Sequence, residues 1–94
     1  MKIIRKRPGA AAEVIRVENT LEALQQEVQG YIEAVTLDKD SVLLCNEEGF
    51  LMGLENQQFL GTTFAGAVLI VGTAGEEFAD VPDRVVRMLC GGAS

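Results

Sequence analysis

The chain has 94 residues, of which 48% are hydrophobic and 23% charged, and its net charge is −6 at pH 7. This length and mixture predict one globular domain over residues 1–94, and the two cysteines fit a reduced cytosolic chain better than a disulfide scaffold. The longest apolar stretch, residues 65–72, is far shorter than the roughly 20 residues of a membrane-spanning helix. We therefore expect no membrane contact, no secretion signal and a cytoplasmic location.

The charge is unevenly distributed along the chain. Residues 1–16 hold five basic side chains against one acid, whereas residues 17–80 hold twelve acids and a single lysine. A basic segment on an acidic body can attract a small anion, because the local potential steers a ligand. Nucleic acid is not expected as a direct partner, because the whole chain is acidic and poor in aromatic residues.

The first third of the chain predicts two strands and a helix. Isoleucine- and valine-rich runs at residues 2–7 and 13–17, separated by Pro8-Gly9, predict strands that need not pair directly. The apolar period then changes to three and four, which predicts a helix capped by Asn19 and ended by a left-handed Gly30. Its buried stripe would consist of Leu21, Leu24 and Val28.

The middle of the chain predicts three strands and a loop. Residues 31–37, 41–46 and 50–54 have the composition of strands, and Asp38-Lys39-Asp40 forms the first turn between them. The second turn, residues 46–49, predicts a type I turn completed by a left-handed glycine. Residues 56–66 are interpreted as an irregular loop whose apolar side chains point inward: Phe59, Leu60 and Phe64.

The last third predicts the centre of the sheet and a second helix. Residues 67–71 are apolar on both faces, as in a central strand. Asp80 would cap the helix, with Pro82 in its first turn, and residues 91–94 would be a frayed end. The side chains predicted to share one face of this helix are Val81, Val85, Met88 and Leu89.

The resulting order, β-β-α-β-β-β-β-α, predicts an α+β fold. It would consist of a single mixed, mainly antiparallel sheet of five to six strands with two helices packed on it. The connection through residues 19–30 should cross over right-handed and make two of the strands parallel.

Catalytic chemistry is not indicated by the residue types. The chain has no histidine, so Cys45 lacks a base, and neither a metal site nor a cofactor is expected. Glu47 and Glu48 are adjacent, and we interpret them as part of a turn exposed to solvent, where nothing would raise a carboxyl pKa for acid catalysis. The enzyme alternative is a nucleotide-cleaving hydrolase that uses one of these two glutamates.

The basic residues at the start of the chain form the candidate site. On a strand, Arg5 and Arg7 point to one face and Lys2 and Lys6 to the other, and Arg16 would lie alongside. The planar guanidinium group is suited to phosphate or carboxylate. The structural alternative is that these charges only protect an edge strand from pairing.

Residues 18–61 and 66–78 resemble domain-of-unknown-function family 3846, small proteins found in phages, conjugative elements and gut Firmicutes. The segments that carry the resemblance are GYIE (30–33), CNEEG (45–49), GL (53–54) and IVG (70–72). This chain has Phe50 where family members usually carry lysine, and Glu55 where they usually carry proline. The resemblance implies a mobile-element protein inside a bacterial host, acting without catalysis by binding a host molecule, as counter-defence.

Two versions of this function remain open. In the first, a homo-oligomer sequesters a small anionic, nucleotide-type host signal: Arg5, Arg7 and Arg16 pair with phosphates, and Tyr31 or Phe50 stacks on a base. In the second, the acidic stretch imitates nucleic acid and blocks a host defence protein that binds nucleic acid. The homo-oligomer is expected because one small core leaves sheet edges uncovered.

Overall fold

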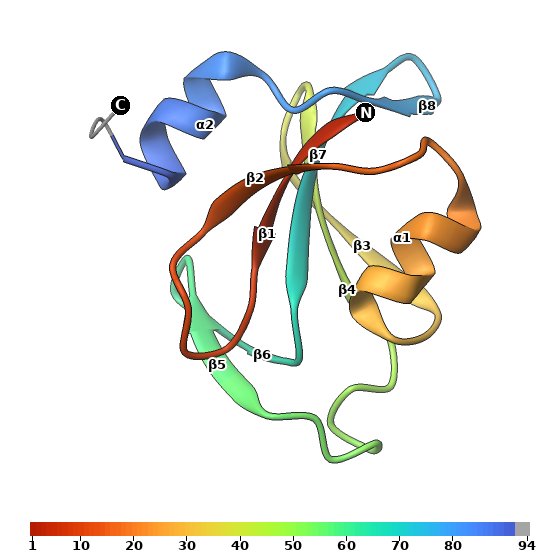
Figure 1. Ribbon diagram of the computed structural model, residues 1–94, viewed down its shortest axis with the longest axis vertical. Helices are drawn as coiled ribbons and strands as arrows, with labels where there is room; N and C mark the ends of the chain where they lie inside the picture. Colours follow the sequence, from red (N-terminus) through yellow and green to blue (C-terminus); the bar gives the residue numbers. More distant parts are fainter. Residues whose placement is uncertain (92–94) are drawn as a thin grey trace.

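A computed structural model describes residues 1–91 and confirms the α+β class, with one main sheet and two helices (Figure 1). Residues 92–94, most of the predicted frayed end, lie outside the described part. The helices are α1 (Leu21–Val28) and α2 (Asp83–Leu89). The strands are β1 (Lys2–Lys6), β2 (Glu13–Arg16), β3 (Ile32–Asp38), β4 (Ser41–Asn46), β5 (Asn56–Phe59), β6 (Thr62–Ala65), β7 (Val68–Ala74) and β8 (Glu77–Ala79).

The main sheet has the strand order β2-β1-β7-β4-β3, and β8 pairs with the end of β7. The central position of β7 confirms the prediction made from its apolar faces. β1 and β2 pair directly, and α1 connects β2 to β3 at the opposite edge. These two edge strands run in the same direction but are not neighbours, so the predicted parallel pair is wrong: every strand pairing within residues 1–91 is antiparallel.

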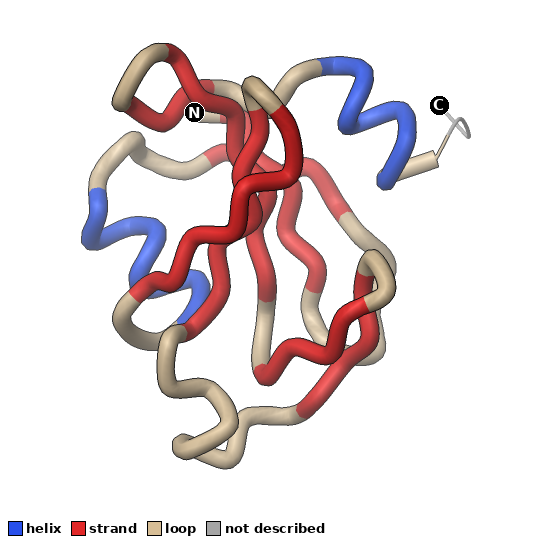
Figure 2. Tube along the Cα trace, turned by 180° about the vertical axis from the view of Figure 1, so that it is seen from behind, coloured by secondary structure: helices blue, strands red, loops and turns tan. Residues whose placement is uncertain are grey.

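The two faces of the main sheet are covered by different elements, as Figure 2 shows from behind. On one face, Leu24 and Val28 of α1 pack on Ile3, Leu44 and Leu69. On the other face, α2 packs on one half of the sheet and the β5–β6 hairpin on the other half. The side chains that line this second face are Ile4, Leu43, Cys45, Val68, Ile70, Val81 and Val85. Because successive side chains of a strand point to opposite faces, the same strands contribute apolar residues to the core on each face of the sheet.

The segment between β4 and β7 differs from the prediction. Residues 47–53 form consecutive turns, so the predicted strand over residues 50–54 is wrong. Gly49 is not left-handed; it is required because a Cβ would lie 2.5 Å from the carbonyl oxygen of Ala65. Residues 56–65 are a regular hairpin rather than a loop, and Leu60 at its tip is exposed. This segment is rich in glutamine and threonine and lacks a clear hydrophobic period, so its packing against the rest of the protein determines that it forms strands.

The helix ends also differ in detail. Thr20, not Asn19, is the N-cap of α1, because its side chain accepts a hydrogen bond from Ala23 N. The left-handed C-cap is Gln29 (φ 66°), and Gly30 is needed for a different reason: a Cβ there would lie 2.8 Å from Asn46 Nδ2. In the buried stripe that was predicted for α1, Leu21 is 57% exposed. No helix of the described residues is long and apolar enough to cross a membrane.

The second helix begins two residues later than expected. Pro82 is the N-cap of α2, and Asp80 instead accepts a hydrogen bond from Lys2 N through Oδ1 at 2.8 Å. Val81 and Val85 are buried as predicted, whereas Met88 is 69% exposed. A proline disfavours a helical conformation for the residue before it, here Val81, and Pro82 is itself extended, so the helix starts only at Asp83.

An ion-pair cluster connects α2 to the β3–β4 turn. Arg84 Nη2 lies 2.8 Å from Asp38 Oδ2, and the same guanidinium contacts both carboxylate oxygens of Asp40. Asp38 also accepts hydrogen bonds from Ser41 Oγ at 2.7 Å and from Asp40 N at 3.1 Å. These hydrogen bonds, the one from Ser41 above all, hold the pKa of Asp38 well below its usual range.

We predict that Asp38→Asn lowers stability at neutral pH and that this difference shrinks in acid. A carboxyl whose pKa is lower in the folded state stabilises the protein above its unfolded-state pKa, about 3.9. That stabilisation is lost as the pH falls from about 4 towards the lower folded pKa. Urea denaturation at neutral and acidic pH measures the difference. Glu76→Gln is the control, because Glu76 lies in an exposed turn and has no ion pair among residues 1–91.

Candidate functional site

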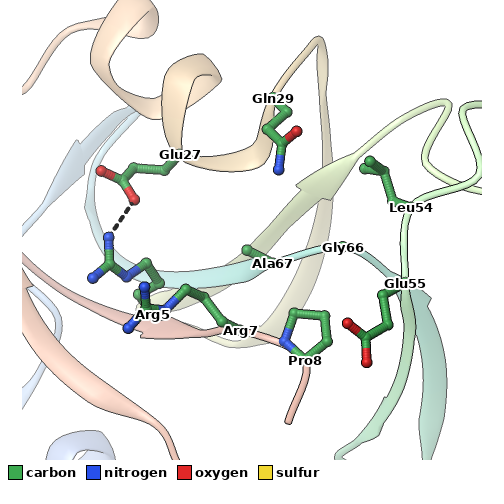
Figure 3. Close-up of a pocket in the computed structure, with 9 residues that line it drawn as sticks. All are labelled: Arg5, Arg7, Pro8, Glu27, Gln29, Leu54, Glu55, Gly66 and Ala67. Carbon is green, nitrogen blue, oxygen red and sulfur yellow. Dashed lines mark hydrogen bonds and ion pairs between the residues drawn. The ribbon is translucent and has the colours of Figure 1, made fainter. Parts of the chain in front are cut away.

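A cavity of about 330 Å³ lies beside the end of β1 (Figure 3). β1 places Ile3 and Arg5 on one face, so the buried Ile3 fixes the direction of Arg5 towards α1, and Arg7 follows just after the end of the strand. Arg5 and Arg7 line this space, which we call the arginine cavity. The sequence therefore predicted correctly that these two side chains lie together.

The other walls of the arginine cavity come from distant parts of the chain. Glu27 and Gln29 line it from the C-terminal end of α1, and Leu54, Glu55, Gly66 and Ala67 line it from the opposite side. Gly66 N donates to Glu55 O at 2.7 Å, which joins the two segments of that side. Gly66 has a φ of +89°, and a Cβ on it would lie 2.8 Å from Leu54 Cδ1. Glycine at this position therefore allows Leu54 to close the wall.

Arg5 is held by two carboxylates. Its Nη1 donates to Glu27 Oε1 at 2.8 Å, and its Nε and Nη2 both donate to Glu13 Oε2 at 3.3 Å. The hydrogen bond with Glu27 is the main cause that raises the pKa of Arg5. Most of its donors are therefore engaged, and an entering anion would have to displace a carboxylate.

Arg7 is much less constrained. Its only ion pair among the described residues joins Nη2 to Glu13 Oε2 at 3.1 Å, and its side chain is 55% exposed. Glu55, which also lines the cavity, makes no ion pair within residues 1–91. The arginine cavity thus contains the guanidinium group of Arg7, the carboxylate of Glu55 and the Gln29 amide as groups that a ligand could contact.

The other predicted site residues do not join this cavity. Arg16 is exposed and lies opposite Lys2 in the β1–β2 register, so it is on the other face of the sheet from Arg5. Tyr31 is 69% exposed and, in the part of the chain that is described, lines neither of the two main cavities. The five residues proposed from the sequence therefore do not form one site.

Phe50 lines a second cavity of about 240 Å³, between the β3–β4 edge of the sheet and the β5–β6 hairpin. Val35, Phe64 and Cys45 contribute apolar surface to it. Cys45 is buried, and burial raises the pKa of its thiol, with the Glu33 carboxylate as a further cause. A buried thiol with a raised pKa is a poor nucleophile.

The glutamates that were considered for acid catalysis lie in the exposed turns of residues 47–53, as the sequence predicted. The residues that sequence reasoning missed are Glu27, Gln29, Leu54 and Glu55. The position of Glu27 could have been inferred from the sequence, because the predicted helix places it in its last turn. The positions of Leu54 and Glu55 could not, because only the folded hairpin brings them to β1.

Comparison with known proteins gives one match. A family model described as "Domain of unknown function (DUF3846)" matches residues 1–90, which confirms the resemblance stated from the sequence. No curated protein and no solved structure matches the chain.

Proposed function

The chain belongs to the DUF3846 family, a domain of unknown function, and we propose that it is a non-enzymatic protein that sequesters a small nucleotide-type ligand in the arginine cavity. The observation that carries this proposal is that the arginine cavity contains the guanidinium group of Arg7, which has a single ion pair among residues 1–91. The wider role, counter-defence by a phage or mobile element in a bacterial host, is part of the same proposal and rests on the family resemblance.

The size and chemistry of the cavity favour a mononucleotide group. A volume of about 330 Å³ is at the lower end of the range of ligand pockets. Arg7 can pair with a phosphate, Glu55 can accept from the polar edge of a base, and the Gln29 amide can both accept from it and donate to it. Since Arg5 is held by Glu13 and Glu27, it supports the site electrostatically rather than by direct contact.

Calorimetry with AMP, ADP-ribose and a cyclic dinucleotide tests this proposal. We expect heat on mixing with at least one of them, and we expect Arg7→Ala to weaken binding by about tenfold or more, because a charge-assisted hydrogen bond contributes roughly 1.5–3 kcal/mol. Arg16→Ala is the matched control, since it removes the same charge from the opposite face. Absence of heat with all three nucleotides, or equal losses in both variants, would contradict the proposal.

A second candidate is a protein inhibitor that imitates nucleic acid. It is favoured by exposed carboxylates that have no ion pair within residues 1–91, among them Glu33, Glu47, Glu48 and Glu55. An acidic surface of this kind binds a basic groove with an affinity that falls as salt increases. Absence of heat in the nucleotide titrations, together with binding to a nuclease that weakens as salt increases, would favour this candidate.

A further inference from the structure

The outer edge of β3 is the longest unpaired strand edge of the main sheet. β3 has seven residues, six of them exposed, and the opposite edge strand β2 has only four. An uncovered edge offers free N–H and C=O groups to another strand, and natural edges are commonly protected by lysine or proline. The sequence of β3, IEAVTLD, contains neither. A bulge between Thr36 and Asp38 interrupts only its end and leaves residues 32–36 regular.

The hydrogen-bond pattern identifies which groups point outward. Tyr31 and Glu47 lie opposite each other in the β3–β4 register, and Glu47 N donates to Tyr31 O at 2.9 Å. Since backbone direction alternates along a strand, Glu33 and Val35 also bond to β4. Ile32, Ala34 and Thr36 therefore direct their N–H and C=O groups to the free edge.

Apolar side chains accompany this edge. Tyr31 is 69% exposed, Val35 is 40% exposed and Phe50, which lines the second cavity together with Val35, is 62% exposed. An apolar surface along a free strand edge marks a contact with another chain.

We propose that β3 pairs antiparallel with β3 of a second copy of this chain, with the two-fold axis at Ala34. The regular segment, residues 32–36, is centred on Ala34, so this register pairs every outward group: Ala34 with its own copy, and Ile32 with Thr36 of the other chain. Glu33 then lies opposite Val35 of the second copy, so the two Glu33 carboxylates are not directly paired. A second copy therefore satisfies every outward N–H and C=O group of residues 32–36 without any further partner.

The charge of the chain predicts how the dimer responds to salt. Each copy carries a net charge of −6, and the resulting repulsion opposes association until salt screens it. Dimerisation should therefore strengthen as ionic strength rises, which is the opposite of the binding of an acidic protein to a basic partner.

Sedimentation of the full chain, with proline variants at the two edges, tests the proposal. The wild type should sediment at about twice its 10.1 kDa chain mass in about 0.5 M salt. Ala34→Pro should be monomeric but folded, because the N–H that it removes points outward. Val14→Pro is the matched control: the mutual hydrogen bonds of Met1 and Val17 place the Val14 N–H outward on the opposite edge, so this variant should remain dimeric.

Disulfide trapping tests the register independently of proline. The Cα atoms of a directly hydrogen-bonded pair lie about 5.5 Å apart, within disulfide range, so Ala34→Cys should form a cross-linked dimer on oxidation. Thr36→Cys should cross-link far less, because it faces Ile32 of the second copy. A monomeric wild type at high protein concentration and high salt would overturn the dimer, and cross-linking only at residue 36 would overturn the register. An edge that instead captures a strand of another protein would leave the wild type monomeric.

Discussion

Gly72→Ala is expected to destabilise the protein by about 3 kcal/mol or more, because the added methyl group has no space to occupy. A Cβ on Gly72 would lie 2.0 Å from the carbonyl oxygen of Asp80 and 2.9 Å from its carbon. These are backbone atoms of the connection that crosses β7 on the way from β8 to α2. Val81 N, at the end of this connection, donates to Lys2 O at 2.9 Å, so the connection cannot move away without losing its attachment to β1. Denaturant unfolding measures the loss.

Gly75→Ala is the matched control for this prediction. Gly75 lies three residues further along in an open turn, with a φ of +64° and no atom within 4 Å of the position of its Cβ. An alanine there has only the cost of a left-handed conformation, about 1 kcal/mol. If Gly72→Ala were no more destabilising than Gly75→Ala, the close approach of Asp80 to β7 would be wrong.

Asn46→Ala is expected to cost about 2–3 kcal/mol, because it leaves two partners in a buried region without their hydrogen bonds. Asn46 is 7% exposed at the end of β4. Its Nδ2 donates to Val28 O at 2.9 Å, and its Oδ1 accepts from Glu48 N at 2.7 Å. One amide therefore fixes the end of α1 and the start of the following turn to the sheet. Thermal or urea unfolding measures the effect.

Asn19→Ala provides the comparison for Asn46. Asn19 also donates through Nδ2 to a carbonyl, that of Phe78 at 3.1 Å, but it does so at an exposed position. Water can replace this hydrogen bond, so a loss of about 0.5 kcal/mol is expected. Equal losses in the two variants would mean that burial does not decide the strength of these contacts.

The strands of the core could be predicted from the sequence because their side chains alternate or are apolar on both faces. β4 was predicted with its observed bounds, and β7 was correctly placed at the centre of the sheet. Both are dominated by valine, leucine and isoleucine, whose burial has a large favourable free energy. The prediction failed over residues 50–65, where no comparable burial is available within the segment. There, hydrogen bonds to other parts of the chain decide the structure, such as those of Gln57 Nε2 to Lys6 O and Gly66 O.

Only the part of the candidate site that depends on the alternation of side chains along one strand could be predicted from the sequence. Arg5 and Arg7 lie two residues apart in the strand that the sequence predicts over residues 2–7, so alternation alone places them on one face. Arg16 is on a different strand, and its face depends on the β1–β2 register, which a spacing argument does not supply. The ion pairs that occupy Arg5 depend on Glu27, which approaches only when α1 packs on the sheet.

By itself, the sequence determined the α+β class, the apolar strands, the basic first strand and the family to which the chain belongs. These follow from local periodicity and composition, which act over a few residues at a time. Only the tertiary structure decided that every strand pairing within residues 1–91 is antiparallel, that Arg5 is held by two carboxylates while Arg7 has one ion pair there, and that the outer edge of β3 has no partner strand in this part of the chain. These features are contacts between segments distant in the chain, and their free energies exist only once both sides have been brought together by the core.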